Sequence, residues 1–247
     1  MDYQSPEIAA IYDCLNPKSE DTNFYVSLAG PQPCAVLDLG CGTGTLCCAL
    51  AKRGHHVAGV DPAVAMLAIA KRKPFADEVE WVESSAQHYR SQRRFDLIFM
   101  TGHAFQTLLS DGDTSAVFQA MRQHVKERGK IAFETRNPLV DWAGEWAGRS
   151  RVVHNPSRGE LTETLTITAN DREFVSFQTA YRFQNRVLTT NSTLRFPSRE
   201  HVADLISRSG LVVREIFGDW KAGPFEPERS QEMIFVVEPV ANAPDGI

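Results

Sequence analysis

Three glycines at alternate positions, Gly40, Gly42 and Gly44, follow an apolar run that contains Asp38. A strand that leads through glycines into a helix lets bare backbone approach a ligand at the helix N-terminus. The dinucleotide pattern G-x-G-x-x-G requires its third glycine three positions after the second, where this chain has Thr45. A Walker loop is excluded because no Gly-Lys-Ser/Thr follows. The spacing therefore predicts a cofactor loop and disfavours a nicotinamide-dependent oxidoreductase, which stays an alternative.

The loop resembles the first motif of the class I S-adenosylmethionine-dependent methyltransferases, D-x-G-x-G-x-G. The matching residues are Asp38, Gly40, Gly42 and Gly44, with Cys41 between them. The order of expected strands and helices extends the resemblance from Val36 to Glu238. It implies an α/β, Rossmann-like fold with a mostly parallel seven-stranded sheet and helices on both faces. It also implies S-adenosyl-L-methionine as the cofactor and S-adenosyl-L-homocysteine as its product.

Asp61 ends the second expected strand, where the family carries an acidic residue. A carboxylate there can accept hydrogen bonds from both ribose hydroxyls. Asp61 can also cap the helix that begins after Pro62, and the two roles are compatible. Ser85 stands where the family usually has an acidic residue for the adenine. The other residues that the resemblance assigns to the cofactor are Tyr12, Pro62, Met66, Ala86, Gln87, Met100, Thr101 and Gly102.

Methyl transfer from a sulfonium is a direct displacement, so the protein aligns donor and acceptor and needs no covalent nucleophile. A general base assists when the acceptor is a hydroxyl or an ammonium. His103 follows the fourth expected strand, and histidine is the side chain whose unperturbed pKa suits that task. We predict His103 as the catalytic base. The alternative is a loop histidine that hydrogen-bonds backbone or shapes the pocket.

Aromatic and cationic side chains near the same edge of the sheet are expected to hold the acceptor. Arg136 follows the fifth expected strand, and open α/β sheets bind ligands at the carboxyl ends of their strands. Three tryptophans and a second arginine would make an aromatic, cationic pocket for an anionic or flat acceptor, with plain packing as the alternative for each tryptophan. The residues assigned to the acceptor are Tyr25, Phe105, Arg136, Trp142, Trp146, Arg195 and Trp220.

The elements that must position these residues alternate between strand and helix in the first half of the chain, which is typical of a parallel sheet. Strands are expected at 35–39, 56–60, 79–82, 95–100 and 130–134, and helices at 45–53, 63–73 and 115–127. Gly129 is expected to end the last of these helices. Ser198 should open a further helix, and 211–217 with 233–237 should form a hairpin.

Residues 149–197 do not follow this alternation of strands and helices. They have no helical period and contain three runs rich in Thr, Phe and Val that predict successive antiparallel strands. The insertion resembles the platform of small-molecule amine methyltransferases of the glycine, sarcosine and amino-sugar types, which covers the active site and can form a dimer interface. We expect one methyltransferase domain over residues 1–247, with residues 1–33 as an N-terminal lid.

Composition narrows the choice of partners. The 247-residue chain has 26 basic and 31 acidic residues and a formal net charge of −5, which argues against nucleic acid as a main partner. Neither a membrane-spanning run nor a secretory signal is recognised. The five cysteines lack zinc-site spacing, so we expect no metal and reduced thiols in a cytoplasmic protein.

These patterns predict an S-adenosylmethionine-dependent methyltransferase that modifies the nitrogen or oxygen of a small molecule. A homodimer through the insertion is one expected arrangement. RNA methylation, protein methylation and a non-catalytic cofactor-binding homologue are the alternatives. The acidic charge favours a metabolite over RNA.

Overall fold

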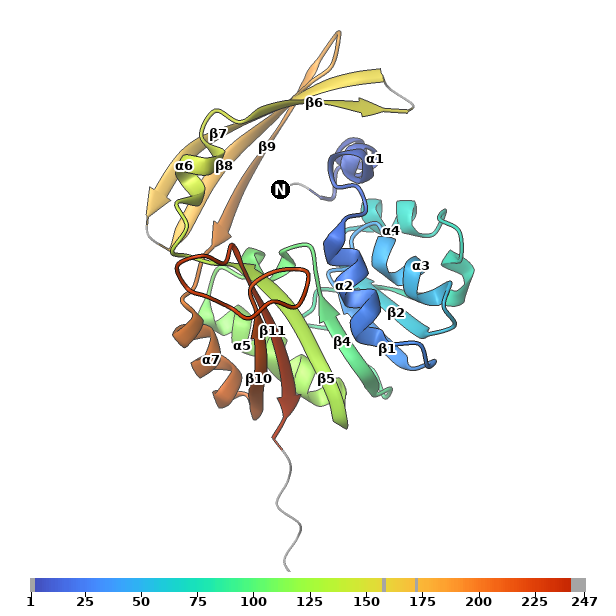
Figure 1. The fold of residues 1–247 in the computed structure, drawn as a ribbon. Coiled ribbons are helices and arrows are strands. Elements are labelled where there is room, and N and C mark those ends of the chain that lie inside the picture. Colours follow the sequence, from blue (N-terminus) through green and yellow to red (C-terminus); the bar gives the residue numbers. More distant parts are fainter. Residues whose placement is uncertain (1–2, 157–158, 172, 241–247) are drawn as a thin grey trace, which may run out of the picture.

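A seven-stranded sheet forms the centre of the molecule, in the order β10-β11-β5-β4-β1-β2-β3 (Figure 1). The computed structural model describes residues 3–156, 159–171 and 173–240. The strands are β1 Ala35–Leu39, β2 His56–Asp61, β3 Val79–Glu83, β4 Phe95–Met100, β5 Val125–Arg136, β10 Leu211–Phe217 and β11 Glu232–Pro239. Among these described strands, β11 alone runs in the direction opposite to the other six. The class I methyltransferase fold expected from the sequence is thereby confirmed.

Helices cover both faces of this sheet, and each face has its own hydrophobic core. One core includes Phe118 of α5 and Leu205 of α7, and the other includes Phe24 of α2 and Leu50 of α3. The helices are α1 Pro6–Leu15, α2 Glu20–Ala29, α3 Thr45–Ala51, α4 Val64–Ala70, α5 Asp111–His124, α6 Trp142–Trp146 and α7 Arg199–Arg208, with short 3-10 turns η1 Ala76–Glu78 and η2 Ala104–Thr107. No helix in the described part of the chain is long and apolar enough to cross a membrane.

The boundary between α5 and β5 differs from the expectation. Ser110 caps α5 by accepting a hydrogen bond from the Asp113 backbone, so the helix begins earlier, and it ends at His124. Val125 pairs with Phe95 at the start of β4 and therefore joins the sheet. Gly129 lies within β5, where an added Cβ would come within 2.9 Å of the Phe95 carbonyl oxygen. The expected helix end at Gly129 was wrong because strand pairing overrides local helical preference.

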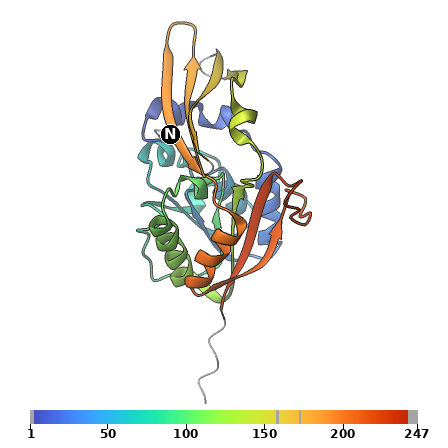
Figure 2. The same cartoon turned by 90° about the vertical axis from the view of Figure 1, so that its left-hand side faces the viewer.

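A second sheet of four antiparallel strands, in the order β6-β7-β8-β9, follows α6. Its strands are β6 Ser150–Asn155, β7 Gly159–Asp171, β8 Phe174–Arg182 and β9 Val187–Arg195. The sequence predicted the last three strands but not β6. Figure 2 shows this antiparallel sheet standing above one end of the seven-stranded sheet. The chain enters it from Arg136, so it lies beyond the carboxyl ends of the parallel strands.

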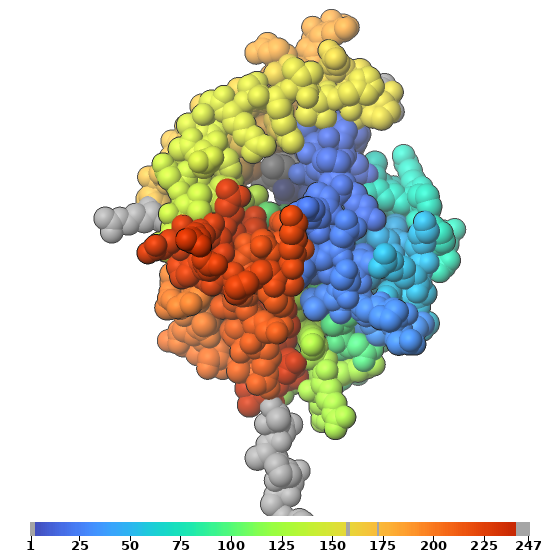
Figure 3. Space-filling view, viewed as in Figure 1, coloured from blue at the N-terminus to red at the C-terminus, as the bar shows by residue number. Residues whose placement is uncertain are grey.

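The first helix joins the two sheets. α1 contacts both α4 and β6, and its buried Ile8, Ile11 and Leu15 pack with Leu161 and Tyr181 of the antiparallel sheet. In the space-filling view, the molecule is hollowed between the antiparallel sheet, α1 and the loop before β11 (Figure 3). The carboxyl edge of the large sheet therefore faces a covered space.

Candidate functional site

The glycine loop after β1 uses its glycines for different purposes. All three have positive φ, +77° at Gly40, +54° at Gly42 and +73° at Gly44. A Cβ at Gly44 would come within 2.4 Å of the Trp81 ring, so this glycine permits close packing between α3 and β3. A Cβ at Gly42 would meet no atom within 4 Å. Gly42 therefore presents bare backbone to open space, as a ligand cradle requires.

Asp61 ties the glycine loop to the start of α4. Its Oδ2 accepts a hydrogen bond from the Gly42 backbone N–H at 2.8 Å, and its Oδ1 accepts one from Ala63 at 2.8 Å. The side chain is buried, which raises the pKa of its carboxyl. Each carboxylate oxygen can accept a further hydrogen bond. The capping contact and an interaction with a diol are therefore compatible in this geometry.

Asp38 carries a buried polar atom that the protein leaves unsatisfied. Its Oδ2 accepts a hydrogen bond from the Cys47 thiol at 3.3 Å, whereas Oδ1 has no partner among the described residues. Burial raises the pKa of this carboxyl to about 7. An unpaired buried acceptor is costly unless a ligand or water satisfies it. Together with the open space over Gly42, it fits a ligand that brings a hydrogen-bond donor to the loop.

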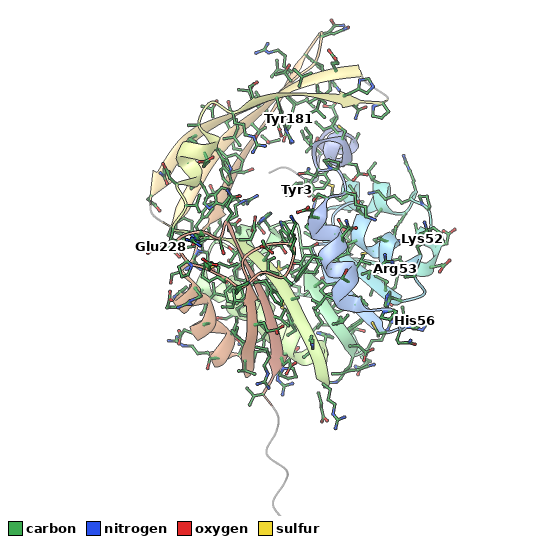
Figure 4. All side chains as sticks on the ribbon, in the orientation of Figure 1. Tyr3, Lys52, Arg53, His56, Tyr181 and Glu228 are labelled. Atoms are coloured by element: carbon green, nitrogen blue, oxygen red, sulfur yellow. The ribbon has the colours of Figure 1, made fainter. Side chains whose placement is uncertain are left out.

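The N-terminal segment covers the glycine loop. Asp13 of α1 accepts a hydrogen bond from the Thr43 hydroxyl at 2.5 Å and forms an ion pair with Lys73 at 2.8 Å. Gln4 donates to the Pro62 carbonyl at 2.7 Å. Tyr12 packs edge-on against Tyr3, with ring centroids 5.9 Å apart. Figure 4 places Tyr3 between the two sheets, below Tyr181.

The two half-buried tyrosines lie within electrostatic range of the buried Asp61. Burial and the nearby Asp61 charge raise the pKa of Tyr3 to about 12, and the Arg136 charge opposes that rise. Burial, followed by the Tyr3 and Asp61 charges, raises the pKa of Tyr12 well above its usual range. Met66 is buried in the same cluster. The segment predicted as a lid therefore lies within electrostatic range of both expected halves of the site.

The remaining cofactor candidates lie at the ends of β3 and β4. The Ser85 hydroxyl lies 2.8 Å from Nδ1 of His88. Gln87 is half-buried, and its carbonyl accepts a hydrogen bond from Arg90. Ala86 and Met100 are buried in the core, and Gly102 has a φ of +67° beyond the half-buried Thr101. Gly40 lies against this loop, because an added Cβ would come within 3.0 Å of Ala104.

His103 is held by two glutamates from neighbouring strands. Its backbone N–H donates to Oε1 of Glu134 at 2.6 Å, and its Nε2 lies 2.9 Å from Oε2 of Glu232. Glu134 also accepts a hydrogen bond from the Tyr25 hydroxyl, and its burial raises the pKa of the carboxyl. Neither glutamate was predicted. Glu134 could have been found as the acidic residue in an apolar strand, but Glu232 had no local signal.

Arg136 lies between two tryptophans at the carboxyl end of β5. Its guanidinium carbon is 5.4 Å from the Trp142 ring centroid and 5.1 Å from that of Trp146. Its Nη1 donates to the Gln106 side chain at 2.8 Å. In the described part of the chain, no carboxylate forms an ion pair with it. Burial lowers the pKa of this guanidinium, and Glu232 and Glu134 oppose that effect.

Four acceptor candidates occupy different places from those expected. Trp220 packs against Phe24 and Tyr25, and Arg195 forms ion pairs with Glu173 and Asp111. The cation beside Trp142 and Trp146 is therefore Arg136, and the expected grouping of three tryptophans with Arg195 was wrong. Tyr25 is buried with its hydroxyl bonded to Glu134, and Phe105 stacks on Phe133 in the core. Packing satisfies both rings, so neither has the open position that direct contact with an acceptor requires.

Known proteins resemble this chain in sequence and in fold. Residues 36–129 match the family described as "Methyltransferase domain". The cypemycin N-terminal methyltransferase of a Streptomyces species is 27% identical over 206 residues, which cover 82% of each chain.

Solved structures extend the likeness over the whole fold. The CcbJ methyltransferase of Streptomyces caelestis has a TM-score of 0.80 at 19% identity and covers 98% of this chain and 100% of its own. The sugar N-methyltransferase KedS8 of a Streptoalloteichus species has a TM-score of 0.71 at 18% identity, with 91% and 92% covered. The methyltransferase-domain match covers the glycine loop, and the strand order is that of the class I S-adenosylmethionine-dependent methyltransferase fold.

Proposed function

We propose that this methyltransferase modifies a nitrogen or oxygen atom of a small, anionic acceptor held between its two sheets. The observation that carries the proposal is Arg136, a half-buried cation between two tryptophans without an ion pair among the described residues. A guanidinium in a desolvated aromatic setting binds a carboxylate or phosphate in a fork geometry and a flat ring by stacking. Arg136 also lies on the strand that carries Glu134, the partner of the His103 loop.

The cofactor side of the proposal uses the loop after β1. S-adenosylmethionine, when bound, supplies an electrophilic methyl group on a sulfonium. Gly42 leaves room for its close approach, and Asp61 has acceptor capacity for its ribose hydroxyls. The unsatisfied oxygen of Asp38 can accept a hydrogen bond from a donor group of the cofactor. Met66 and Ser85 flank the expected adenine position.

The acceptor side is covered by segments far apart in the sequence. α1 with Tyr3 and Tyr12 would act as the lid over residues 38–66, and α6 with the antiparallel sheet would close the other side. Such closure excludes water and aligns the two reactants. His103 would accept the proton that an amine or hydroxyl acceptor loses. The names of similar proteins that act on N-termini or amino sugars favour nitrogen over oxygen.

Two further expectations complete the proposal. Five free cysteines fit a reducing compartment, so we place the protein in the cytoplasm. A homodimer through the antiparallel sheet would bury exposed apolar side chains such as Val152, which is 66% exposed. Analytical ultracentrifugation tests this arrangement, because a monomer at micromolar concentration contradicts it.

The central experiment is a turnover screen with methyl-labelled S-adenosylmethionine against amines, carboxylates and hydroxylated metabolites. Calorimetry with S-adenosylhomocysteine on the same protein separates cofactor binding from acceptor choice. We expect cofactor binding, and methyl transfer to amines that carry a carboxylate or phosphate in preference to matched neutral amines. A protein that binds S-adenosylhomocysteine but prefers neutral acceptors contradicts the role given to Arg136. A protein that does not bind it contradicts the whole proposal.

A further inference from the structure

We propose that Glu232, the first residue of β11, is a positioning residue that fixes the tautomer and orientation of the His103 imidazole for proton acceptance. The inference rests on the proposed function, since it needs an acceptor that loses a proton. Glu232 Oε2 and His103 Nε2 are 2.9 Å apart, although 129 residues separate them in the chain. Their side chains are 13% and 20% exposed, so water screens the pair only weakly.

The chemistry of this contact determines which nitrogen can act as the base. An ionised carboxylate only accepts hydrogen bonds, so Nε2 of the neutral imidazole must carry the proton. The lone pair then resides on Nδ1, for which the described residues provide no partner. A histidine without this contact would exchange freely between its two tautomers. Glu232 therefore selects the form of His103 that presents an acceptor at Nδ1.

A second carboxylate fixes the backbone of the same residue. His103 has a φ of +58°, a conformation that non-glycine residues rarely adopt, and it persists where surrounding contacts impose it. The Glu134 carboxylate accepts the His103 N–H and also the Tyr25 hydroxyl, so it links the loop to α2. The imidazole is thus held at its ring by β11 and at its backbone by β5.

The register of the two strands explains how both carboxylates reach one loop. Glu232 is directly opposite Arg136, and Glu134 is opposite Ile234 in the antiparallel pair. Residues that are opposite each other or two apart share one face of a sheet, so Glu134, Arg136 and Glu232 project from the same side. The sheet pairing itself therefore brings two carboxylates and one guanidinium to the loop after β4.

These groups also define the electrostatic setting of His103. Glu232 on β11 and Glu134 on β5 face it directly, with Arg136 on β5 and the Tyr25 hydroxyl on α2 in the next layer. During the reaction, the acceptor N–H or O–H bond breaks, its proton moves to Nδ1, and the electron pair stays on the acceptor atom. The Glu232 carboxylate then balances the charge of the imidazolium.

The test begins with an NMR titration that needs no acceptor. The chain has seven histidines, and the signal lost in the His103→Gln variant identifies His103. We expect the Nε2–H tautomer in the wild-type protein. Glu232→Gln keeps the size and removes the charge, and because its amide can donate as well as accept, it should remove the preference for the Nε2–H tautomer. Glu232→Asp keeps the acceptor-only carboxylate on a shorter arm and should retain more of that preference.

Glu238→Gln is the matched control, because it makes the same change on the same strand where Glu238 pairs with Arg214. It should leave the His103 tautomer unchanged, because Glu238 lies near the other end of β11 from Glu232. Unchanged affinity for S-adenosylhomocysteine verifies that each variant is folded. An Nδ1–H tautomer in the wild type, or a tautomer preference that Glu232→Gln does not change, overturns the inference.

Turnover measurements test whether the Glu232–His103 pair acts in the reaction. With the acceptor that the screen finds best, Glu232→Gln should lower kcat about tenfold, leave KM within about twofold, and move the pH of half-maximal kcat in the acid direction. A purely structural role would not shift that midpoint, and an unshifted midpoint overturns the inference. Failure of the proposed function gives a different result from failure of this inference, because the wild-type protein would then methylate no acceptor in the screen. In that case the inference fails as well.

Discussion

Different kinds of contact hold the cofactor side and the acceptor side of the site. On the cofactor side, backbone N–H groups of the loop and of the helix start converge on one carboxylate, as Gly42 N–H and Ala63 N–H do on Asp61. On the acceptor side, side chains meet across long sequence distances, as His103 does with Glu232. The first arrangement depends on local geometry, and the second depends on the fold having formed.

This difference suggests how each side tolerates change. Backbone contacts are indifferent to many side chains but demand particular φ angles, so the loop after β1 is restricted in conformation. Contacts between side chains change with every substitution, so Arg136, Trp142 and Trp146 can be altered without disturbing the glycine loop. Acceptor choice and cofactor binding should therefore be separable by mutation.

The largest effect is expected at the glycine loop. Gly42→Val combines a β-branched side chain with a φ of +54° and fills the open space above the loop. We expect S-adenosylhomocysteine affinity to fall at least about 100-fold, or about 2.7 kcal/mol, in calorimetry. Gly30→Val is the matched control, since Gly30 has a φ of +72° and open space but lies between α2 and β1. Equal affinities in the two variants would contradict a backbone cradle.

The next effect is expected at Asp61. Asp61→Ala removes the acceptor for two backbone N–H groups and for the proposed ribose contact. Affinity for S-adenosylhomocysteine should fall by about 1–3 kcal/mol, as is usual for the loss of a charged hydrogen-bond partner. Asp96→Ala is the control, because Asp96 accepts a hydrogen bond from the Ala35 N–H at the amino ends of the strands, at the other end of the sheet from the glycine loop. If both variants bind alike in calorimetry, the ribose lies elsewhere.

The same division explains what the sequence could predict. The strand order, the glycine loop and the place of Asp61 follow from short patterns of apolar residues and glycines, and the structure confirms the order of the strands. Val125 was assigned to a helix because its partner Phe95 is thirty residues away. Strand β6 was missed because only its pairing with β7 distinguishes it from a loop.

Long-range partners also account for the errors at the site. Trp142 and Trp146 were grouped with Trp220 and Arg195 by residue type, but the guanidinium between Trp142 and Trp146 comes from Arg136 at the end of β5. Glu232 was not considered because nothing in its surrounding sequence connects it to His103. Residue types were thus informative on the cofactor side, whereas the acceptor side required the positions of the strands.

Arg136→Lys is expected to have a smaller effect, which changes acceptor binding and leaves cofactor binding unchanged. Lysine keeps the charge but loses the planar fork and the stacking between two rings. The KM for an anionic acceptor should rise about tenfold, or about 1.4 kcal/mol, with unchanged S-adenosylhomocysteine affinity. Arg195→Lys is the control, because Arg195 is occupied by Glu173 and Asp111. A larger rise in KM for that control would restore the grouping that the structure rejects.

The smallest effect is expected where α1 meets both sides. Asp13 ties this helix to the glycine loop through Thr43 and Lys73, whereas Glu7 ties it to the antiparallel sheet through Arg186. The Glu7–Arg186 pair is exposed and the Asp13–Lys73 pair is half-buried, so each contributes on the order of 1 kcal/mol. Asp13→Ala should speed S-adenosylhomocysteine dissociation two- to fivefold in stopped-flow measurements, and added salt should shrink the difference from the wild type. Glu7→Ala, on the same helix, should leave that rate unchanged. Equal acceleration by both variants would mean that α1 moves as one rigid cover, and the two sides would not then be independent.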